Sequence, residues 1–254
     1  HLRPYYPIFL GKIIINSSTK LICKFNLLFI NFDYICEKFY GMSDSAKIAF
    51  LFDLDGVLID SEQEYTRIWH VIEKEFPTGV ENFTLKIKGT TLDNILDTYF
   101  KDNRNKVEEK LYELESDMQY RYKEGAHSLL KTLQEQNIPC VMVTSSNHLK
   151  LNHLWTQLPE LKQYFSFIVD GDMVSSSKPD PEGYLTGAKD IGIPSSCCVV
   201  VEDSLQGVKA GRASGGYVIG VIGTLPGETL SPFCDQVVDS LDKIDFTLIS
   251  ETLS

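Results

Sequence analysis

Five predominantly apolar runs constrain the fold of this chain more than any other feature. They occupy residues 48–52, 138–143, 165–169, 197–201 and 217–222. Runs of this length without polar alternation are typical of strands that are buried on both faces of a parallel sheet. Amphipathic helical patterns separate them, for example at 126–136 and 181–191. This alternation predicts an α/β fold with a doubly wound, Rossmann-like parallel sheet.

The interval between the first run and the next core helix is too long for a simple crossover connection. Within it, Ser61 followed by Glu64 predicts a capping box at the start of one helix, and Thr91 predicts the N-cap of a second. An apolar stripe predicts a third helix, with Val107, Leu111, Leu114 and Met118. The expected organisation is a small all-α cap domain at 61–122 inserted into a core formed by 42–60 and 123–254.

Residues 1–41 have an unusual composition. Of these 41 residues 23 are apolar, yet none is Ala or Val, and Ile, Phe, Tyr, Asn and Lys, whose codons are AT-rich, account for 23. The composition becomes ordinary at Met42. Our hypothesis is therefore that residues 1–41 are a non-native or disordered appendage, which arose because the start site was assigned too far upstream. A membrane or targeting segment is the alternative. It is disfavoured because the uncharged stretch near its centre, 25–32, is far shorter than the about 20 apolar residues of a membrane span.

The charge of the chain limits its partners. The formal net charge is −11, and from Met42 onward 19 Lys and Arg face 33 Asp and Glu. A chain this acidic repels phosphate backbones, so nucleic acid is not an expected partner, and no pattern indicates a membrane or an obligate protein partner.

The cysteines indicate a reducing compartment. They are Cys23, Cys36, Cys140, Cys197, Cys198 and Cys234, and their spacing forms neither a CxxC pair nor a metal-ligand pattern. We interpret them as reduced core thiols, which predicts a cytoplasmic protein.

Acidic residues stand where two of the apolar runs end. Asp53 and Asp55 follow the first run, and Glu202 and Asp203 follow the fourth. Because the carboxyl ends of parallel strands form the ligand crevice of such a sheet, these four carboxylates are expected to converge. Converged carboxylates repel one another and need a cation, and a few hard oxygen ligands favour Mg²⁺. The alternative for any one of them is that it caps the following helix.

Four short motifs accompany these strand ends. They are Phe52-Asp53-Leu54-Asp55-Gly56-Val57, Val143-Thr144-Ser145, Lys178-Pro179-Asp180-Pro181 and Val201-Glu202-Asp203-Ser204. In order and spacing they resemble the motifs of the haloacid dehalogenase (HAD) superfamily, and the chain looks most like its beta-phosphoglucomutase branch. The resemblance extends from Met42 to the C-terminus and includes the helical cap. It implies a Mg²⁺-dependent phosphatase that hydrolyses a small phosphorylated metabolite, such as a sugar phosphate, through an aspartyl-phosphate.

The resemblance also implies roles for individual residues in the chemistry. Asp53 would be the nucleophile, and Asp55 would protonate the leaving oxygen and then deprotonate the attacking water. Thr144 would hold the phosphoryl group through its hydroxyl, helped by the Ser145 amide. Lys178 would neutralise the charge that develops on the phosphoryl oxygens.

A metal site and a substrate contact follow from the same resemblance. Asp203 would bind Mg²⁺ with the Asp53 carboxylate and the Asp55 carbonyl, and Glu202 would bind it directly or through water. In the cap, the loop 86–91 looks like the family's specificity loop. Its Lys88 is the candidate substrate contact, and Gly89 would allow close approach.

Two other functions stay open at this level. A sugar-phosphate mutase is disfavoured because the chain has Tyr65 and Leu92 where the mutases carry His and Arg, although Arg67 and His70 lie near the first position. A dehalogenase is disfavoured by the presence of Asp55. A catalytically silent protein that only binds phosphometabolites is the alternative from a different class. The sequence names neither the substrate nor the oligomeric state.

Overall fold

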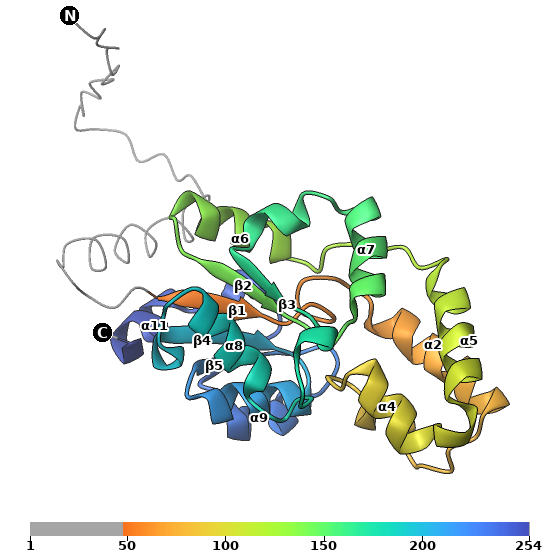
Figure 1. The fold of residues 1–254 in the computed structure, drawn as a ribbon. Coiled ribbons are helices and arrows are strands. Elements are labelled where there is room, and N and C mark those ends of the chain that lie inside the picture. Colours follow the sequence, from red (N-terminus) through yellow and green to blue (C-terminus); the bar gives the residue numbers. More distant parts are fainter. Residues whose placement is uncertain (1–47, 254) are drawn as a thin grey trace, which may run out of the picture.

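The computed structural model describes residues 48–253. The segment 1–41 therefore lies outside the described residues, and the hypothesis about its origin stays a prediction. Figure 1 shows a sheet flanked by helices, with a group of helices beyond the carboxyl ends of its strands.

The sheet has six parallel strands. They are β1 (Ala49–Phe52), β2 (Cys140–Val143), β3 (Phe167–Val169), β4 (Cys198–Glu202), β5 (Tyr217–Val221) and β6 (Gln236–Val238). Their order is β3-β2-β1-β4-β5-β6, and every neighbouring pair is parallel. The doubly wound α/β fold is confirmed, and each of the five apolar runs contains a strand. The sequence analysis missed β6, because this strand begins with Gln236 and has only two consecutive apolar residues before Asp239.

The helices alternate with the strands in the core and follow one another in the insertion after β1. They are α2 (Glu62–Glu75), α3 (Phe83–Lys86), α4 (Leu92–Tyr99), α5 (Arg104–Glu115), α6 (Ala126–Glu135), α7 (His148–Gln157), α8 (Glu182–Asp190), α9 (Leu205–Ser214), α10 (Gly227–Leu230) and α11 (Phe246–Leu253). The two helices predicted at 126–136 and 181–191 correspond to α6 and α8. Among the described residues, no helix is long and apolar enough to cross a membrane.

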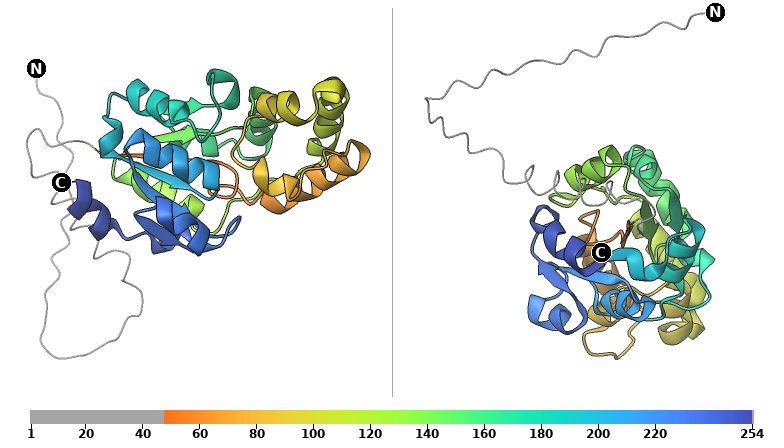
Figure 2. Two further views of the ribbon diagram at one scale, coloured as in Figure 1. Left: turned by 90° about the horizontal axis from the view of Figure 1, so that it is seen from below. Right: turned by 90° about the vertical axis from the view of Figure 1, so that its left-hand side faces the viewer.

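Two apolar layers cover the two faces of the sheet. Alternate residues of β1 point to opposite faces, so Phe50 and Phe52 pack in the layer that contains α6, α7 and α11. Ala49 and Leu51 pack in the layer that contains α8 and α9. Burial on both faces explains why the strands read as continuous apolar runs. The arrangement of helices above and below the sheet can be followed in Figure 2.

The insertion between β1 and α6 is helical, and aromatic side chains hold it together. The Trp69 ring of α2 stacks on Phe100 at a centroid distance of 6.1 Å, and Phe83 meets both rings edge-on at 5.9 and 5.6 Å. On α5, Val107 and Leu111 are buried as the stripe predicted. These contacts give the insertion an apolar interior that is continuous with the core. The boundaries of a cap domain at 61–122 stay a prediction.

Three details of the predicted helix signals were wrong. Ser61 and Thr91 do precede α2 and α4, but neither side chain caps its helix. The Ser61 hydroxyl donates to Asp55, and Thr91 Oγ1 lies 2.6 Å from Ser177 Oγ. Met118 is buried but lies beyond the end of α5. The two hydroxyl groups contact the catalytic motifs instead of their own helices, which a local sequence pattern does not reveal.

The cysteines within 48–253 are free, in agreement with the prediction of reduced thiols. Cys140 and Cys198 are buried in the core, whereas Cys197 and Cys234 are half-buried. Burial raises the pKa of the Cys140 thiol to about 12, so it stays protonated and unreactive at neutral pH.

Candidate active site

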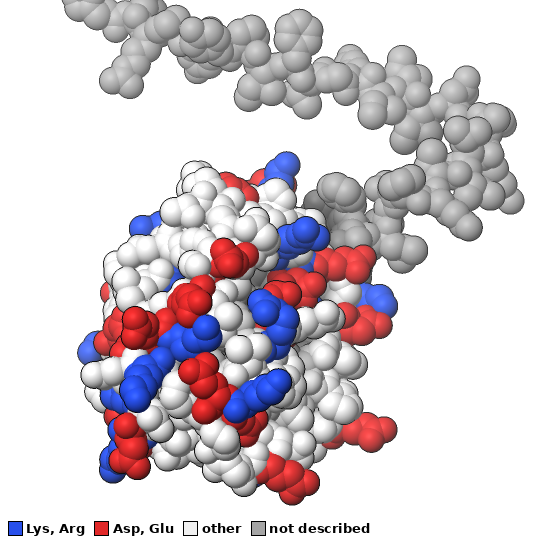
Figure 3. All heavy atoms as spheres, turned by 90° about the vertical axis from the view of Figure 1, so that its right-hand side faces the viewer, with Lys and Arg blue, Asp and Glu red and all other residues white. Residues whose placement is uncertain are grey.

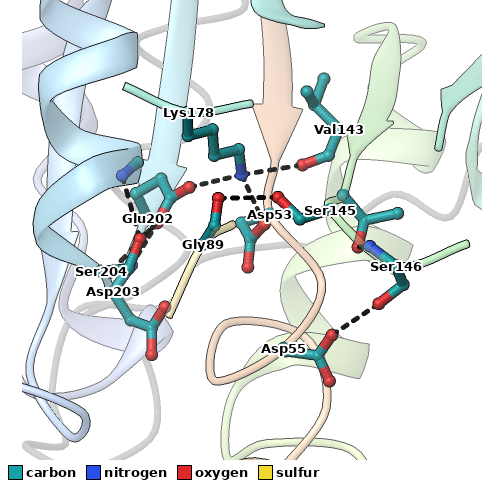
Figure 4. A network of polar contacts seen from close by, with 12 residues as sticks. Asp53, Asp55, Gly89, Val143, Ser145, Ser146, Lys178, Glu202, Asp203 and Ser204 are labelled. Atoms are coloured by element: carbon teal, nitrogen blue, oxygen red, sulfur yellow. Dashed lines mark hydrogen bonds and ion pairs between the residues drawn. The ribbon is translucent and has the colours of Figure 1, made fainter. Parts of the chain in front are cut away.

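The predicted catalytic residues lie together at the carboxyl ends of β1 and β4. These two strands are neighbours at the point where the strand order reverses, which is where open α/β sheets bind ligands. Asp53 follows β1 directly, and its backbone amide donates to the Val201 carbonyl of β4 at 3.0 Å. Asp203 follows β4. The sheet therefore brings together side chains that are far apart in the sequence (Figure 4).

Lys178 is the cation at the centre of this cluster. Its buried ammonium group donates to Asp53 Oδ1 and to Glu202 Oε1, each at 2.6 Å, and to the Val143 carbonyl at 3.2 Å. Burial lowers the pKa of Lys178, but the facing carboxylates of Asp53 and Glu202 raise it more, to well above its ordinary value. Lys178 is therefore charged, and it directs that charge to the predicted nucleophile.

Three carboxylates could hold a cation here. Oxygen atoms of Asp53, Glu202 and Asp203 lie within 4.8 Å of one another. Burial, and next the Glu202 carboxylate, raise the pKa of Asp203 to about 7, and burial raises that of Asp53. Lys178 contacts two of these carboxylates, and Lys123 and Lys88 lower the pKa of Asp203, but together they do not offset the effect of burial. Hard oxygen ligands of this kind suit Mg²⁺.

Glu202 differs from the other two carboxylates because protein donors fill its oxygens. Oε1 accepts from Lys178 and from Tyr184 Oη at 2.8 Å. Oε2 accepts from the Asp203 and Ser204 amides and from Ser204 Oγ, at 3.0 to 3.1 Å. Five donors exceed the about four lone-pair positions of a carboxylate, so direct binding of a metal by Glu202 is disfavoured. Its contacts hold Lys178 and the turn that carries Asp203.

Gly56 permits the tight turn after the first motif. Its φ is +76°, and a Cβ atom there would lie 2.0 Å from Asp203 Oδ2. Any other residue would clash with this predicted metal ligand and would strain the backbone. Asp203 Oδ2 in turn accepts a hydrogen bond from the Thr224 hydroxyl.

The side chain of Asp55 lies away from the metal cluster and has three donors of its own. Ser61 Oγ donates to Oδ1, while Ser146 Oγ, at 2.9 Å, and Lys150 Nζ donate to Oδ2. Burial raises the pKa of Asp55, but Lys150 and the two hydroxyls lower it more, to below its ordinary value. The sequence analysis missed Lys150, Ser61 and Ser146 as site residues.

The second motif joins the core to the cap loop. Thr144 Oγ1 accepts from the Ser146 amide at 3.0 Å, so its hydroxyl shapes the turn that begins α7. Ser145 Oγ donates to the Gly89 carbonyl at 2.8 Å. Gly89 has a φ of +75°, and a Cβ atom there would lie 2.7 Å from Ser204 Oγ, so a glycine is required where the cap loop meets the turn after β4. The predicted close approach of a substrate to Gly89 stays a prediction.

A pocket of about 120 Å³ lies between the catalytic motifs and the cap helices. Its core side carries Asp53, Asp55 and Thr144, and its cap side includes Trp69, Ile87 and Leu92. Lys88 also lines it, and its ammonium group contacts the Glu62 carboxylate. The pocket therefore combines a charged end at Asp53 with a cap wall of mixed polar and apolar side chains.

The comparisons with known proteins agree with this geometry. The model of the haloacid dehalogenase-like hydrolase family matches residues 49–215. The chain belongs to this family. It is 30% identical over 207 residues to hexitol phosphatase A of Escherichia coli, covering 78% of this chain and 93% of that protein. The family resemblance stated from the motifs is confirmed.

Two further relatives extend the comparison. The chain is 32% identical over 223 residues to a bifunctional riboflavin kinase/FMN phosphatase of Arabidopsis thaliana, and it spans 79% of its own length and only 56% of that protein. The structure of a beta-phosphoglucomutase from Clostridium difficile superposes with a TM-score of 0.66 at 23% identity, covering 81% of this chain and 96% of that one. At this low identity, the likeness to the beta-phosphoglucomutase structure concerns the fold alone. The sequence relatives are named phosphatases, so the prediction of a phosphatase of this family is confirmed.

Proposed function

We propose that this protein is a Mg²⁺-dependent phosphatase that hydrolyses small phosphate monoesters through an aspartyl-phosphate on Asp53. One observation carries the proposal: Asp53 lies at the charged end of the pocket, held by the buried cation Lys178, with Asp55 lining the same pocket. A carboxylate nucleophile, a charge-neutralising lysine and an acid–base carboxylate are the groups that this two-step reaction needs.

In the first step, a carboxylate oxygen of Asp53 forms a bond to phosphorus, and the bond between phosphorus and the leaving oxygen breaks. Asp55 gives a proton to that oxygen. Because Lys150 and the two hydroxyls lower the pKa of Asp55 in the free site, it must take up this proton when the phosphate dianion binds beside it and raises its pKa. We assign the proton to Oδ1, because Oδ2 already accepts from Ser146 and Lys150. The Ser61 hydroxyl at Oδ1 can turn to accept a hydrogen bond, which the ammonium group of Lys150 cannot do.

In the second step, water attacks the aspartyl-phosphate and Asp55 removes a proton from it. The acyl phosphate bond breaks, inorganic phosphate leaves, and the Asp53 carboxylate is restored. Lys178 balances the charge on the phosphoryl oxygens in both steps. A Mg²⁺ ion held by the Asp53 and Asp203 carboxylates and the Asp55 carbonyl would supply the remaining positive charge.

The charges of the pocket favour a phosphatase over a mutase. Among the described residues that line the pocket, the only cations are Lys88 and Lys150, and both contact carboxylates. A second phosphate dianion would therefore meet no uncompensated positive charge. The Tyr65 hydroxyl donates its only hydrogen to Glu115 at 2.7 Å, so this position offers neither a free donor nor an imidazole to gate water. The intact catalytic set disfavours a silent binding protein.

The proposed substrate is a monophosphate whose remaining part is uncharged and carries hydroxyl groups. A paired lysine and carboxylate, Lys88 and Glu62, offer one donor and one acceptor to a hydroxyl group without favouring a second anion. The relatives named for hexitol and FMN act on phosphorylated small molecules, which supports this class.

We also propose that the protein works in the cytoplasm, with no nucleic-acid, membrane or obligate protein partner. The net charge of −11 supports the absence of nucleic acid. On the face of the molecule in Figure 3, basic and acidic side chains lie intermixed and form no continuous basic band.

The test of the proposed function is a panel of monophosphates and bisphosphates of sugars and polyols, assayed with Mg²⁺ and with EDTA. We expect phosphate release from monophosphates with Mg²⁺, and a loss of about 10²-fold or more when the metal is removed. Bisphosphates are expected to react more slowly than the matched monophosphates. Equal rates with and without the metal would contradict the proposed Mg²⁺ dependence, and phosphate transfer between sugar positions would favour a mutase.

The role of Lys88 has a separate test. Lys88→Ala should lower kcat/KM for the best polyol monophosphate. The loss of transition-state stabilisation should be about 1–3 kcal/mol, the scale of one charge-assisted contact. An aryl phosphate lacks the hydroxyl-rich group, so its turnover should change much less. The matched control is Lys86→Ala, because Lys86 is exposed two residues earlier in the chain. Equal losses for both substrates would place Lys88 in the chemical step or in folding.

A further inference from the structure

Lys150 is a buried lysine to which neither the sequence motifs nor the proposed mechanism gives a role of its own. It lies in the first turn of α7, where its backbone amide donates to the N-cap side chain of Asn147 at 3.0 Å. Only 7% of its side chain is exposed. A lysine with so little exposure is rare unless its charge is paired.

The ammonium group of Lys150 faces the acid–base carboxylate rather than the nucleophile. It donates to Asp55 Oδ2, the oxygen that also accepts from Ser146. The nucleophile Asp53 has its own cation, Lys178. The site thus assigns one buried lysine to each catalytic aspartate.

Lys150 also contacts residues of the cap helices. Its Nζ lies 4.0 Å from the centroid of the Tyr65 ring, over the ring face. The Tyr65 hydroxyl donates to Glu115 Oε1 at 2.7 Å, and Glu115 is a second carboxylate close enough to interact with the Lys150 charge. Tyr65 belongs to α2 and Glu115 to α5, so one charge on the core contacts Asp55 and α2 and acts electrostatically on α5.

We propose that Lys150 is the positioning residue of Asp55. It fixes Oδ2 and thereby orients Oδ1 toward the leaving oxygen. Its contact with the Tyr65 ring and its electrostatic interaction with Glu115 couple this orientation to the position of the cap. A serine donor can rotate away from a carboxylate, whereas the Lys150 stem is held by burial and its charge by the aromatic ring. This inference rests on the proposed function, in which Asp55 transfers the proton.

The test compares two substrates of the same shape, phenyl phosphate and p-nitrophenyl phosphate. Phenol is a poor leaving group that needs a proton, whereas p-nitrophenolate leaves readily without one. Lys150→Met keeps the length of the side chain and removes its charge. We expect kcat/KM to fall by about tenfold or more for phenyl phosphate and by less than about threefold for p-nitrophenyl phosphate, because general acid catalysis contributes to the first substrate only.

Two variants control for charge and for folding. Lys150→Arg keeps the charge and should restore most of the activity on phenyl phosphate. Lys131→Met is the matched surface control, since the Lys131 side chain is 65% exposed on α6, and it should leave both substrates unchanged. If Lys150→Met does not fold, Lys150→Gln can replace it, because it keeps a hydrogen-bond donor at this position. Its kcat/KM should again fall more for phenyl phosphate than for p-nitrophenyl phosphate, by a smaller factor.

The outcomes separate this inference from the proposed function. Equal losses for both substrates would place Lys150 in phosphate binding or in folding, and no loss for either would also overturn the inference. Asp55→Asn provides the reference: its phosphorylation step, measured in a single turnover because its hydrolysis step stalls, should show the same selective loss by a larger factor. If Asp55→Asn shows the selective loss and Lys150→Met does not, only the role of Lys150 is wrong. If Asp55→Asn shows no selective loss, the proposed role of Asp55 fails.

Discussion

Asp53→Asn is expected to reduce phosphatase turnover by about three orders of magnitude or more, the scale seen when an enzyme loses its nucleophile. The amide is nearly isosteric with the carboxylate, but its nitrogen and oxygen are poor nucleophiles toward phosphorus. It also offers no negative charge to Mg²⁺ or to Lys178, which donates to Asp53 Oδ1 at 2.6 Å. Phosphate release from the best monophosphate in the panel measures the effect.

Folding must be unaffected for this result to be informative. Circular dichroism and the Tm in EDTA should show that Asp53→Asn is folded, because the substitution removes one of several buried acids in a cluster short of positive charge. Asp190→Asn, at an exposed position on α8, is the matched control and should keep full activity. Residual activity of Asp53→Asn above about a tenth of wild type would mean that another group is the nucleophile.

Lys178→Met is expected to damage both stability and activity. Without the ammonium group, the Asp53 and Glu202 carboxylates that it now joins would be buried without their counter-charge. Breaking a buried ion pair by removing one partner costs about 3–5 kcal/mol of the free energy of unfolding. The same charge acts on the phosphoryl group, so kcat should also fall by about 10²-fold or more.

Urea denaturation measures this stability loss, in EDTA and again with Mg²⁺. We expect the loss to be smaller with Mg²⁺, because a cation bound by Asp53 and Asp203 replaces part of the missing charge. Lys189→Met is the matched control on the exposed surface of α8. If Lys178→Met were as stable as wild type in EDTA, the buried lysine would not balance the carboxylates as the contacts indicate.

The sequence was sufficient to predict the core of the fold and the convergence of carboxylates at the ends of two strands. Strands buried on both faces produce apolar runs such as 197–201, and the first polar residue after such a run marks the strand end. In a parallel sheet these ends share one edge, so Asp53 and Asp203 had to lie close together once β1 and β4 were neighbours. This reasoning needs only local patterns and one rule of topology.

The contacts that the sequence did not reveal depend on tertiary structure. Lys150 sits on an amphipathic helix where a lysine normally faces water, and only the packing of α2 against this region buries it beside Asp55. Ser61 has the spacing of a capping box, yet a nearby carboxylate takes its hydroxyl instead. The five donors around Glu202 come from three different segments of the chain, so a motif could not decide between the two predicted modes, direct binding of the metal or binding through water.

The most direct test of the account is the detection of the covalent intermediate. The Asp55→Asn protein lacks the group that activates water, so p-nitrophenyl phosphate should phosphorylate it while hydrolysis of the aspartyl-phosphate stalls. Mass spectrometry of the acid-quenched protein and of its peptides should then locate one phosphoryl group on Asp53. The double variant with Asp53→Asn should carry none. A phosphoryl group on any other residue, or its absence from Asp55→Asn while wild type turns the substrate over, would contradict the mechanism.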